Sequence, residues 1–141
     1  MKRLFLDANV LFTAAHNPAG KAAFVLELGA EGRWELITSA LAVEEAHRNL
    51  GLKFPSSVAR LEDLPRGVRR VGAPSGFVFP VELPSKDRPI LAAALCAGAT
   101  HLLTGDTKHF GPYMDDPGHL GGLCIRTVAA FLESVAREGT P

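Results

Sequence analysis

The sequence predicts an α/β domain: a three-layer sandwich in which helices flank a central, mainly parallel β-sheet. Two observations predict this fold class. Four short apolar runs are continuous rather than alternating, which is typical of strands buried on both faces of a parallel sheet. Segments with helical patterning separate these runs, so that strand and helix alternate along the chain. The four runs are residues 4–6, 36–37, 101–103 and 123–125.

The remaining elements fill the stretches between those runs. We expect helices over residues 9–16, 21–29, 40–50, 90–97 and 128–137, and weaker strands at residues 68–71 and 76–81. The segment 54–84 contains five prolines, so it is expected to be mostly loop, with one short helix near residues 56–64.

Length and composition narrow the class of protein. The 141 residues are the length of one domain and no linker divides them, so we expect a single domain over residues 1–141. Fifteen basic and fifteen acidic residues balance, so no global field draws the chain to nucleic acid or membrane. Cys96 and Cys124 are too few for a disulfide framework and lack metal-binding spacing, which is typical of a reducing compartment.

No segment of the sequence is typical of a membrane protein or of a signal peptide. The first apolar run lasts three residues, and the longest later one, residues 90–99, is about half of a membrane span. We therefore expect a soluble, cytoplasmic protein without a membrane partner.

Three aspartates are positioned to meet at one edge of the predicted sheet. Asp7 directly follows the first strand and Asp106 follows the strand near residues 101–103, while Asp87 opens the helix that leads into that strand. Ligands of parallel α/β sheets collect beyond the carboxyl ends of the strands. We therefore expect these three carboxylates at one site.

A fourth carboxylate is expected from the helix that follows the second strand. This helix carries Glu44 and Glu45. Helical spacing places Glu45 beside the apolar stripe that contains Ala46 and Leu50, whereas Glu44 points nearly opposite. Glu44 also stands four residues before Arg48, the spacing of an exposed ion pair. Glu45 is therefore the glutamate expected to face the site.

Each acid also has an ordinary structural explanation. Asp7 fits a helix N-cap, Asp87 a charge that complements a helix dipole, and Asp106 a turn residue. Glu45 fits a charge at the edge of a helix. Gathered together, however, four carboxylates repel one another and raise one another's pKa unless a cation joins them. Oxygen ligands without a cluster of His or Cys favour Mg²⁺ or Mn²⁺ over zinc.

These motifs, in this order, resemble the PIN domain, a family of metal-dependent ribonucleases. The resemblance covers nearly the whole chain and rests on residues 4–11, 38–45, 87–106 and 123–132. It implies that Asp7, Glu45, Asp87 and Asp106 are catalytic and bind the metal. The chain departs from many family members at Lys108 and His109, where those members carry a further acid.

The resemblance implies a specific activity. We expect a Mg²⁺- or Mn²⁺-dependent endoribonuclease of the VapC-like toxin type, which hydrolyses phosphodiester bonds of single-stranded RNA. Candidate partners are the RNA substrate, a small antitoxin protein and a second copy of the chain in a homodimer. Asn9, Thr104 and Thr107 are candidates for substrate binding or for support of the acids, and turn or capping roles are the alternative.

Two other functions stay open at the level of sequence. The first is a non-catalytic PIN-like module that binds RNA or a protein. The second, more distant, is an aspartate-dependent phosphatase, which Asp7, Lys86 and Asp106 imitate loosely. That chemistry needs a second acid two residues after the nucleophile, and Asn9 occupies that position.

A basic stretch lies in the middle of the chain. Six basic residues oppose two acidic ones between residues 48 and 70, a local net charge of +4. The stretch is either a solvated surface or a patch that holds RNA phosphates near the acidic edge. Its basic members are Arg48, Lys53, Arg60, Arg66, Arg69 and Arg70.

Overall fold

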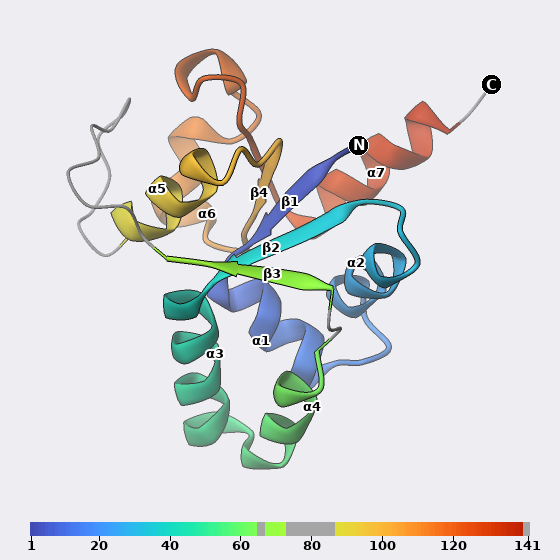
Figure 1. Ribbon diagram of the computed structural model, residues 1–141, viewed down its shortest axis with the longest axis vertical. Helices are drawn as coiled ribbons and strands as arrows, with labels where there is room; N and C mark the ends of the chain where they lie inside the picture. The colour runs from blue at the N-terminus through green and yellow to red at the C-terminus, as the bar shows by residue number, and fades with distance from the viewer. Residues whose placement is uncertain (65–66, 73–86, 140–141) are drawn as a thin grey trace.

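A five-stranded parallel sheet forms the centre of the molecule (Figure 1). The computed structural model describes residues 1–64, 67–72 and 87–139. Within them the strand order is β3-β2-β1-β4-β5, and every pairing is parallel. The strands are β1 (Arg3–Leu6), β2 (Glu35–Ser39), β3 (Val68–Val71), β4 (His101–Leu103) and β5 (Cys124–Arg126).

Helices cover both faces of this sheet. In Figure 1, helices α1 to α4 lie below the strands and α5 and α6 lie above them. Helix α7 packs against α2 and β5. The predicted α/β sandwich is thereby confirmed. The helices are α1 (Ala8–His16), α2 (Lys21–Ala30), α3 (Ala40–Lys53), α4 (Val58–Glu62), α5 (Arg88–Cys96), α6 (Thr107–Phe110) and α7 (Val128–Glu138).

The apolar runs of the sequence form the middle of the core. Leu4, Phe5 and Leu6 of β1 are fully buried, because helices cover β1 on both faces. Phe5 lies in register with Ile37 on one side and with Leu102 on the other. Burial on both faces explains why these strands show no alternation of polar and apolar residues.

Most predicted elements agree with the structure to within a few residues, and the differences have physical reasons. The expected helix near residues 56–64 is divided into a 3-10 turn at Pro55–Ser57 and the short α4. Helix α6 was not predicted, since four residues are too few to show a period. The strand expected at residues 76–81 lies outside the described residues.

The strand order determines where a ligand site can form. Successive strands are added outward from β1 through β2 to β3, and the chain then returns to β4 on the opposite side of β1. Such a reversal leaves a crevice beyond the carboxyl ends of the two central strands. Here those strands are β1 and β4, which end just before Asp7 and Thr104.

None of the helices within residues 1–64, 67–72 and 87–139 has the length and apolar character that crossing a membrane requires.

Candidate active site

A cavity of about 250 Å³ opens at the crevice between β1 and β4. The acids predicted from sequence, Asp7, Glu45, Asp87 and Asp106, all line it, and Asn9 lines it with them. These residues come from separate elements: the end of β1, helix α3, the residue before α5 and the turn after β4. The fold therefore brings together carboxylates that lie up to a hundred residues apart in sequence.

Asp7 is both a helix cap and a residue of the cavity. Its Oδ1 accepts a hydrogen bond of 2.7 Å from the backbone N–H of Ala8, which caps α1. Its Oδ2 accepts one of 2.7 Å from the hydroxyl of Thr104. The two explanations offered by the sequence are thus compatible, because capping fixes this carboxylate at the wall of the cavity.

Asn9 connects the first turn of α1 to the turn after β4. Its Oδ1 accepts a bond of 2.7 Å from the backbone N–H of Gly105, and its Nδ2 lies 3.3 Å from both Asp7 Oδ2 and Thr104 Oγ1. Thr104 Oγ1 also accepts the backbone N–H of Asp106 at 3.0 Å. Asn9 and Thr104 therefore fix the position of the Asp7 carboxylate relative to the turn that carries Asp106.

Thr107 differs from the other two candidate supporting residues. It begins α6, its side chain is exposed, and it is not among the residues that line the cavity. Its backbone N–H donates to the carbonyl of Gly105 at 3.0 Å, which is a turn contact. The structure therefore places Thr107 in the local turn and outside this cavity.

Burial and like charges act together on Asp7. Desolvation raises the pKa of its carboxyl, and the nearby charges of Glu45 and Asp87 raise it further. The hydrogen bonds from Thr104 and Ala8 oppose this by lowering the pKa, but the net shift is upward. Burial, and to a smaller extent the neighbouring carboxylates, thus disfavour the charged form of Asp7.

The chemistry of the cavity fits a hard divalent cation. Its charged donors near Asp7 are carboxylate oxygens, the ligands that Mg²⁺ and Mn²⁺ prefer. In the part of the chain that the structure describes, no three His, Cys, Asp or Glu side chains are placed to hold a metal ion as they stand. Direct ligation would therefore need movement of side chains, and Glu45, which is exposed on α3, is the acid with most freedom to move.

The two adjacent glutamates of α3 point in different directions, as their positions along the helix predict. Glu45 lines the cavity, whereas Glu44 Oε1 lies 3.9 Å from Arg48 Nη2 on the outside of α3. Asp87 is buried, with 8% of its surface exposed, although it stands at the start of a helix.

The cavity extends beyond the acids in a direction that sequence analysis did not identify. Phe12 and Thr13 from α1, and Asn49 and Lys53 from α3, line this extension. A signal was present, because Asn49 and Lys53 follow Glu45 at intervals of four residues and so share its face of the helix.

The basic stretch does not form one patch at this cavity. Lys53 lines the cavity, but Arg48 pairs with Glu44, and Arg60 Nη1 donates to the carbonyl of Ala15 at 3.3 Å. Arg69 pairs with Glu35 and donates to the carbonyl of Ala97 at the sheet edge. Arg70 lies exposed on β3. Arg66, and the Lys86 of the phosphatase alternative, lie outside the described residues.

The fold and the site define a class of protein: an α/β domain with an acidic cavity at the switch point of a parallel sheet. A family model described as a PIN domain matches residues 3–108. The chain therefore belongs to the PIN-domain family. A comparison with curated proteins finds no match.

Two solved structures share the fold. One is VapBC2 from Rickettsia felis bound to a DNA fragment from its promoter, with a TM-score of 0.62 and 15% identity over 89% of this chain and 98% of that one. The other is VapBC-1 from nontypeable Haemophilus influenzae, with a TM-score of 0.54 and 14% identity over 90% of this chain and 98% of that one. At these identities the likeness is one of fold.

Proposed function

We propose that this chain is a Mg²⁺- or Mn²⁺-dependent endoribonuclease that hydrolyses phosphodiester bonds of single-stranded RNA. The observation that carries the proposal is the single cavity lined by Asp7, Glu45, Asp87 and Asp106 at the carboxyl ends of the central strands. Membership of the PIN-domain family supports it. The four carboxylates give the cavity a negative charge that repels a phosphodiester. A bound cation is therefore needed before a phosphodiester can enter.

Each residue has a defined task under this proposal. Asp7, Glu45, Asp87 and Asp106 bind the cation and are the catalytic acids. When bound, the cation lowers the pKa of the attacking water and offsets charge on the leaving oxygen. Thr104 and Asn9 orient Asp7 by hydrogen bonds of 2.7 and 3.3 Å, which keeps one carboxylate oxygen from rotating away. Such preorganisation reduces the rearrangement needed during reaction.

The cellular role that we propose is that of a VapC-like toxin, which a small antitoxin protein holds inactive. The fold that the chain shares with the two VapBC proteins supports this role. Release of the antitoxin would then expose RNA to cleavage.

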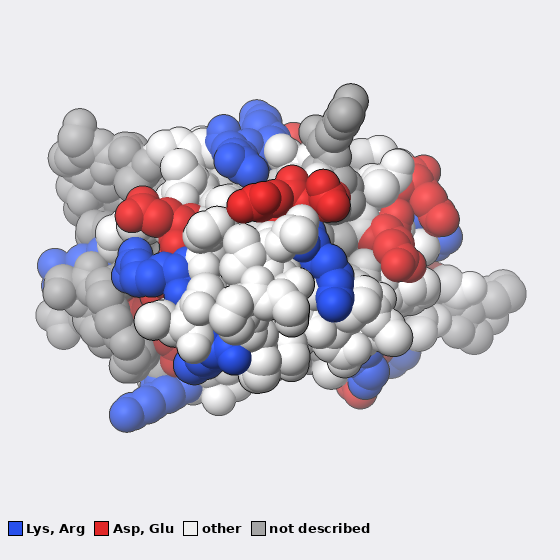
Figure 2. Space-filling view, turned by 90° about the horizontal axis from the view of Figure 1, so that it is seen from below, with Lys and Arg blue, Asp and Glu red and all other residues white. Residues whose placement is uncertain are grey.

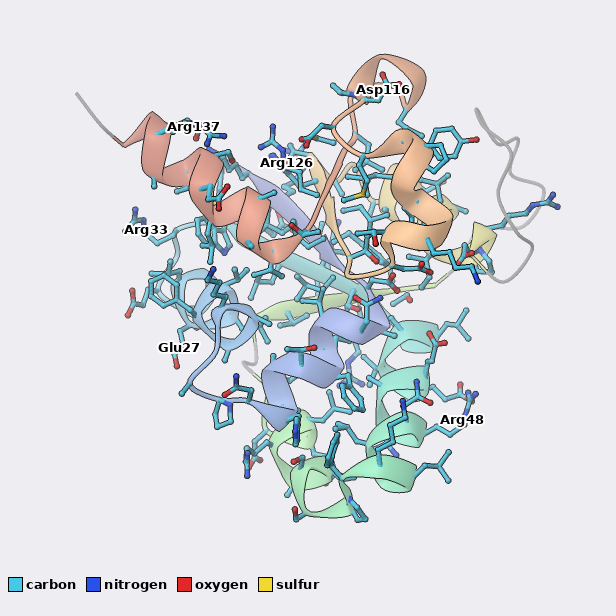
Figure 3. All side chains as sticks on the ribbon, turned by 180° about the vertical axis from the view of Figure 1, so that it is seen from behind. Glu27, Arg33, Arg48, Asp116, Arg126 and Arg137 are labelled. Atoms are coloured by element: carbon cyan, nitrogen blue, oxygen red, sulfur yellow. The ribbon has the colours of Figure 1, made fainter. Side chains whose placement is uncertain are left out.

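Calorimetric titration with Mn²⁺ tests the proposal without relying on activity. The wild-type chain should bind Mn²⁺, and Asp106→Asn should weaken that binding about tenfold or more, since it removes one charged ligand. Asp116→Asn is the matched control, because it removes one carboxylate from the loop at the top of Figure 3, away from α1 and α3.

The outcome also separates the enzyme from a non-catalytic module. A chain that binds single-stranded RNA but takes up no metal at millimolar concentration would be a binding module. A chain that binds metal and cleaves RNA, with both properties lost in Asp106→Asn alone, would have the proposed activity.

A further inference from the structure

The extension of the cavity between α1 and α3 forms a groove of its own. We call it the interhelical groove and define it by Phe12, Thr13, Asn49 and Lys53. Helices α1 and α3 lie side by side (Figure 3) and both begin at the carboxyl edge of the sheet. The groove therefore runs away from the four acids along the length of both helices.

The groove changes charge along its length. Its inner end carries the acids, and its outer end carries Lys53, which is eight residues, or about 12 Å, beyond Glu45 along α3. Lys53 Nζ lies 5.8 Å from the centre of the Phe12 ring, and no carboxylate of the described residues forms an ion pair with it. The ammonium group is thus available to an anionic ligand.

Aromatic rings gather at this outer end. His16 and Phe54 stack with ring centres 3.6 Å apart and planes 17° apart, and the Phe12 ring lies 5.9 Å from Phe54. We call these three residues the ring cluster. Phe54 is 38% exposed, although it is a large apolar residue. A cation beside exposed rings is the combination that proteins use to bind single-stranded nucleic acids.

The described residues seen in Figure 2 form no broad basic patch that could bind RNA by charge alone. Figure 2, which views the molecule from below Figure 1, shows basic and acidic residues interspersed around an uncharged centre. A strand of RNA is therefore not held by a broad basic field on this face, and an individual cation gains importance.

We propose that the interhelical groove is the subsite for the nucleotide that flanks the scissile phosphate, where Lys53 contacts the flanking phosphate and the ring cluster contacts its base. The inference rests on the proposed ribonuclease function and extends it to a substrate longer than the linkage that is cut. Lys53 is a positioning residue, because it acts on the strand and not on the reacting atoms.

The rings beside Lys53 favour a nucleic acid strand over an acidic peptide. Both ligands would be attracted to Lys53 and to the cation of the proposed site. Only a nucleic acid strand also brings a base that can contact the ring cluster next to a phosphate that contacts Lys53.

Comparison of a long and a short substrate tests the role of Lys53. Lys53→Ala and the control Arg48→Ala each remove one charge from α3, and Arg48 points away from α1 (Figure 3). With Mn²⁺, Lys53→Ala should lower kcat/KM for a single-stranded RNA oligonucleotide about tenfold, through KM. Turnover of bis(p-nitrophenyl) phosphate, which carries no flanking phosphate, should fall far less in Lys53→Ala than cleavage of the oligonucleotide does.

Binding gives a second readout that does not depend on cleavage. In an Asp7→Asn background, Lys53→Ala should reduce the slope of log Kd against log salt for the labelled oligonucleotide by about 0.7. Phe54→Leu should weaken binding about tenfold. Phe54→Leu should have no effect on binding of an oligonucleotide with an abasic site at the flanking position, because the base that the Phe54 ring contacts is then already absent.

The possible failures are distinguishable. In one outcome, Lys53→Ala and Arg48→Ala have the same KM and the same salt slope while wild type cleaves RNA. In that case the flanking subsite is wrong, and the proposed ribonuclease function is retained. If the Lys53 variant instead loses only binding of a protein partner, the groove is a protein-docking site. If wild type cleaves neither substrate with Mg²⁺ or Mn²⁺, the proposed function fails and the inference fails with it.

Discussion

At the scale of the residue, Asp7 has two structural roles with opposite effects on stability. It caps α1, which stabilises the helix, and its carboxylate is buried near the like charges of Glu45 and Asp87. Burial raises the pKa of its carboxyl, so the ionised form costs stability at neutral pH. We expect Asp7→Asn to abolish metal-dependent RNA cleavage while its free energy of unfolding equals or exceeds that of wild type. Asparagine retains the capping oxygen for Ala8. Urea unfolding at pH 7 and a cleavage assay check both parts, and a fully active variant would contradict the assignment.

Glu44 and Glu45 provide a matched pair on one helix. Glu45→Gln should reduce RNA cleavage by orders of magnitude, because it removes a proposed metal ligand from the cavity. Glu44→Gln removes only an exposed ion pair with Arg48 and should cost about 0.3–0.5 kcal/mol of stability with no loss of activity. The two variants are compared by single-turnover cleavage and by thermal unfolding. Loss of activity in Glu44→Gln instead would mean that α3 is rotated from its described position.

At the scale of the element, two helical glycines should respond in opposite ways to alanine. A Cβ on Gly29 of α2 would lie 2.5 Å from side-chain carbons of Leu36, which is buried in β2. A Cβ on Gly51 of α3 would meet nothing within 4 Å.

Gly29→Ala should therefore destabilise the fold by about 1–3 kcal/mol through overpacking. Gly51→Ala should stabilise it by up to about 1 kcal/mol, because alanine is the better helix former and no contact opposes it. Chemical denaturation of the two variants measures both changes. Equal effects of the same sign would show that α2 does not press on β2 as described.

Predictability from sequence also differs between elements. The strands that begin near Leu4, Leu36 and His101 were predictable because burial on both faces leaves an uninterrupted apolar run. The last strand is displaced by one residue, to Cys124–Arg126, since neighbouring apolar residues do not mark a boundary. Helical spacing places Lys53 on the same face of α3 as Glu45, but the contact of that face with Phe12 and Thr13 was not predictable, because it depends on how α1 packs against α3.

The same distinction holds for the candidate site. Helical phase was enough to separate Glu45 from Glu44, since both lie on one regular helix. The basic stretch predicted the site less well, because a local net charge does not show which way each side chain points. Arg60 and Arg69 donate to backbone carbonyls outside the cavity. The bonds from Asn9 to Gly105 and Asp7 join distant segments, which no local pattern reveals.

At the scale of the whole molecule, global stability should depend on the protonation of His101. Burial, followed by the charges of Arg126 and Lys2, lowers its pKa from 6.5 to about 4. The folded state therefore favours the neutral ring, and the unfolded state binds the additional proton between pH 6.5 and pH 4. This contribution is fully present above pH 6.5 and is lost as the pH falls towards 4.

His101→Gln should remove that part of the pH dependence. The side chain is only half-buried, so solvent screening limits the expected difference between pH 7 and pH 4.5 to about 1 kcal/mol. Urea unfolding of wild type and variant at the two pH values measures it. An equal decline in both proteins would assign the acid sensitivity to other groups.

The order of the strands also determines when the candidate site is assembled during synthesis. Strand β1 leaves the ribosome before the other four strands, yet it occupies the centre of the sheet, and its neighbour β4 follows only at residues 101–103. Until then one edge of β1 has no partner, and Asp7 lacks the hydroxyl of Thr104 that fixes it. On the proposed function, a nascent chain would stay inert towards the messenger and ribosomal RNA around it until β4 and Asp106 have been made and have joined β1.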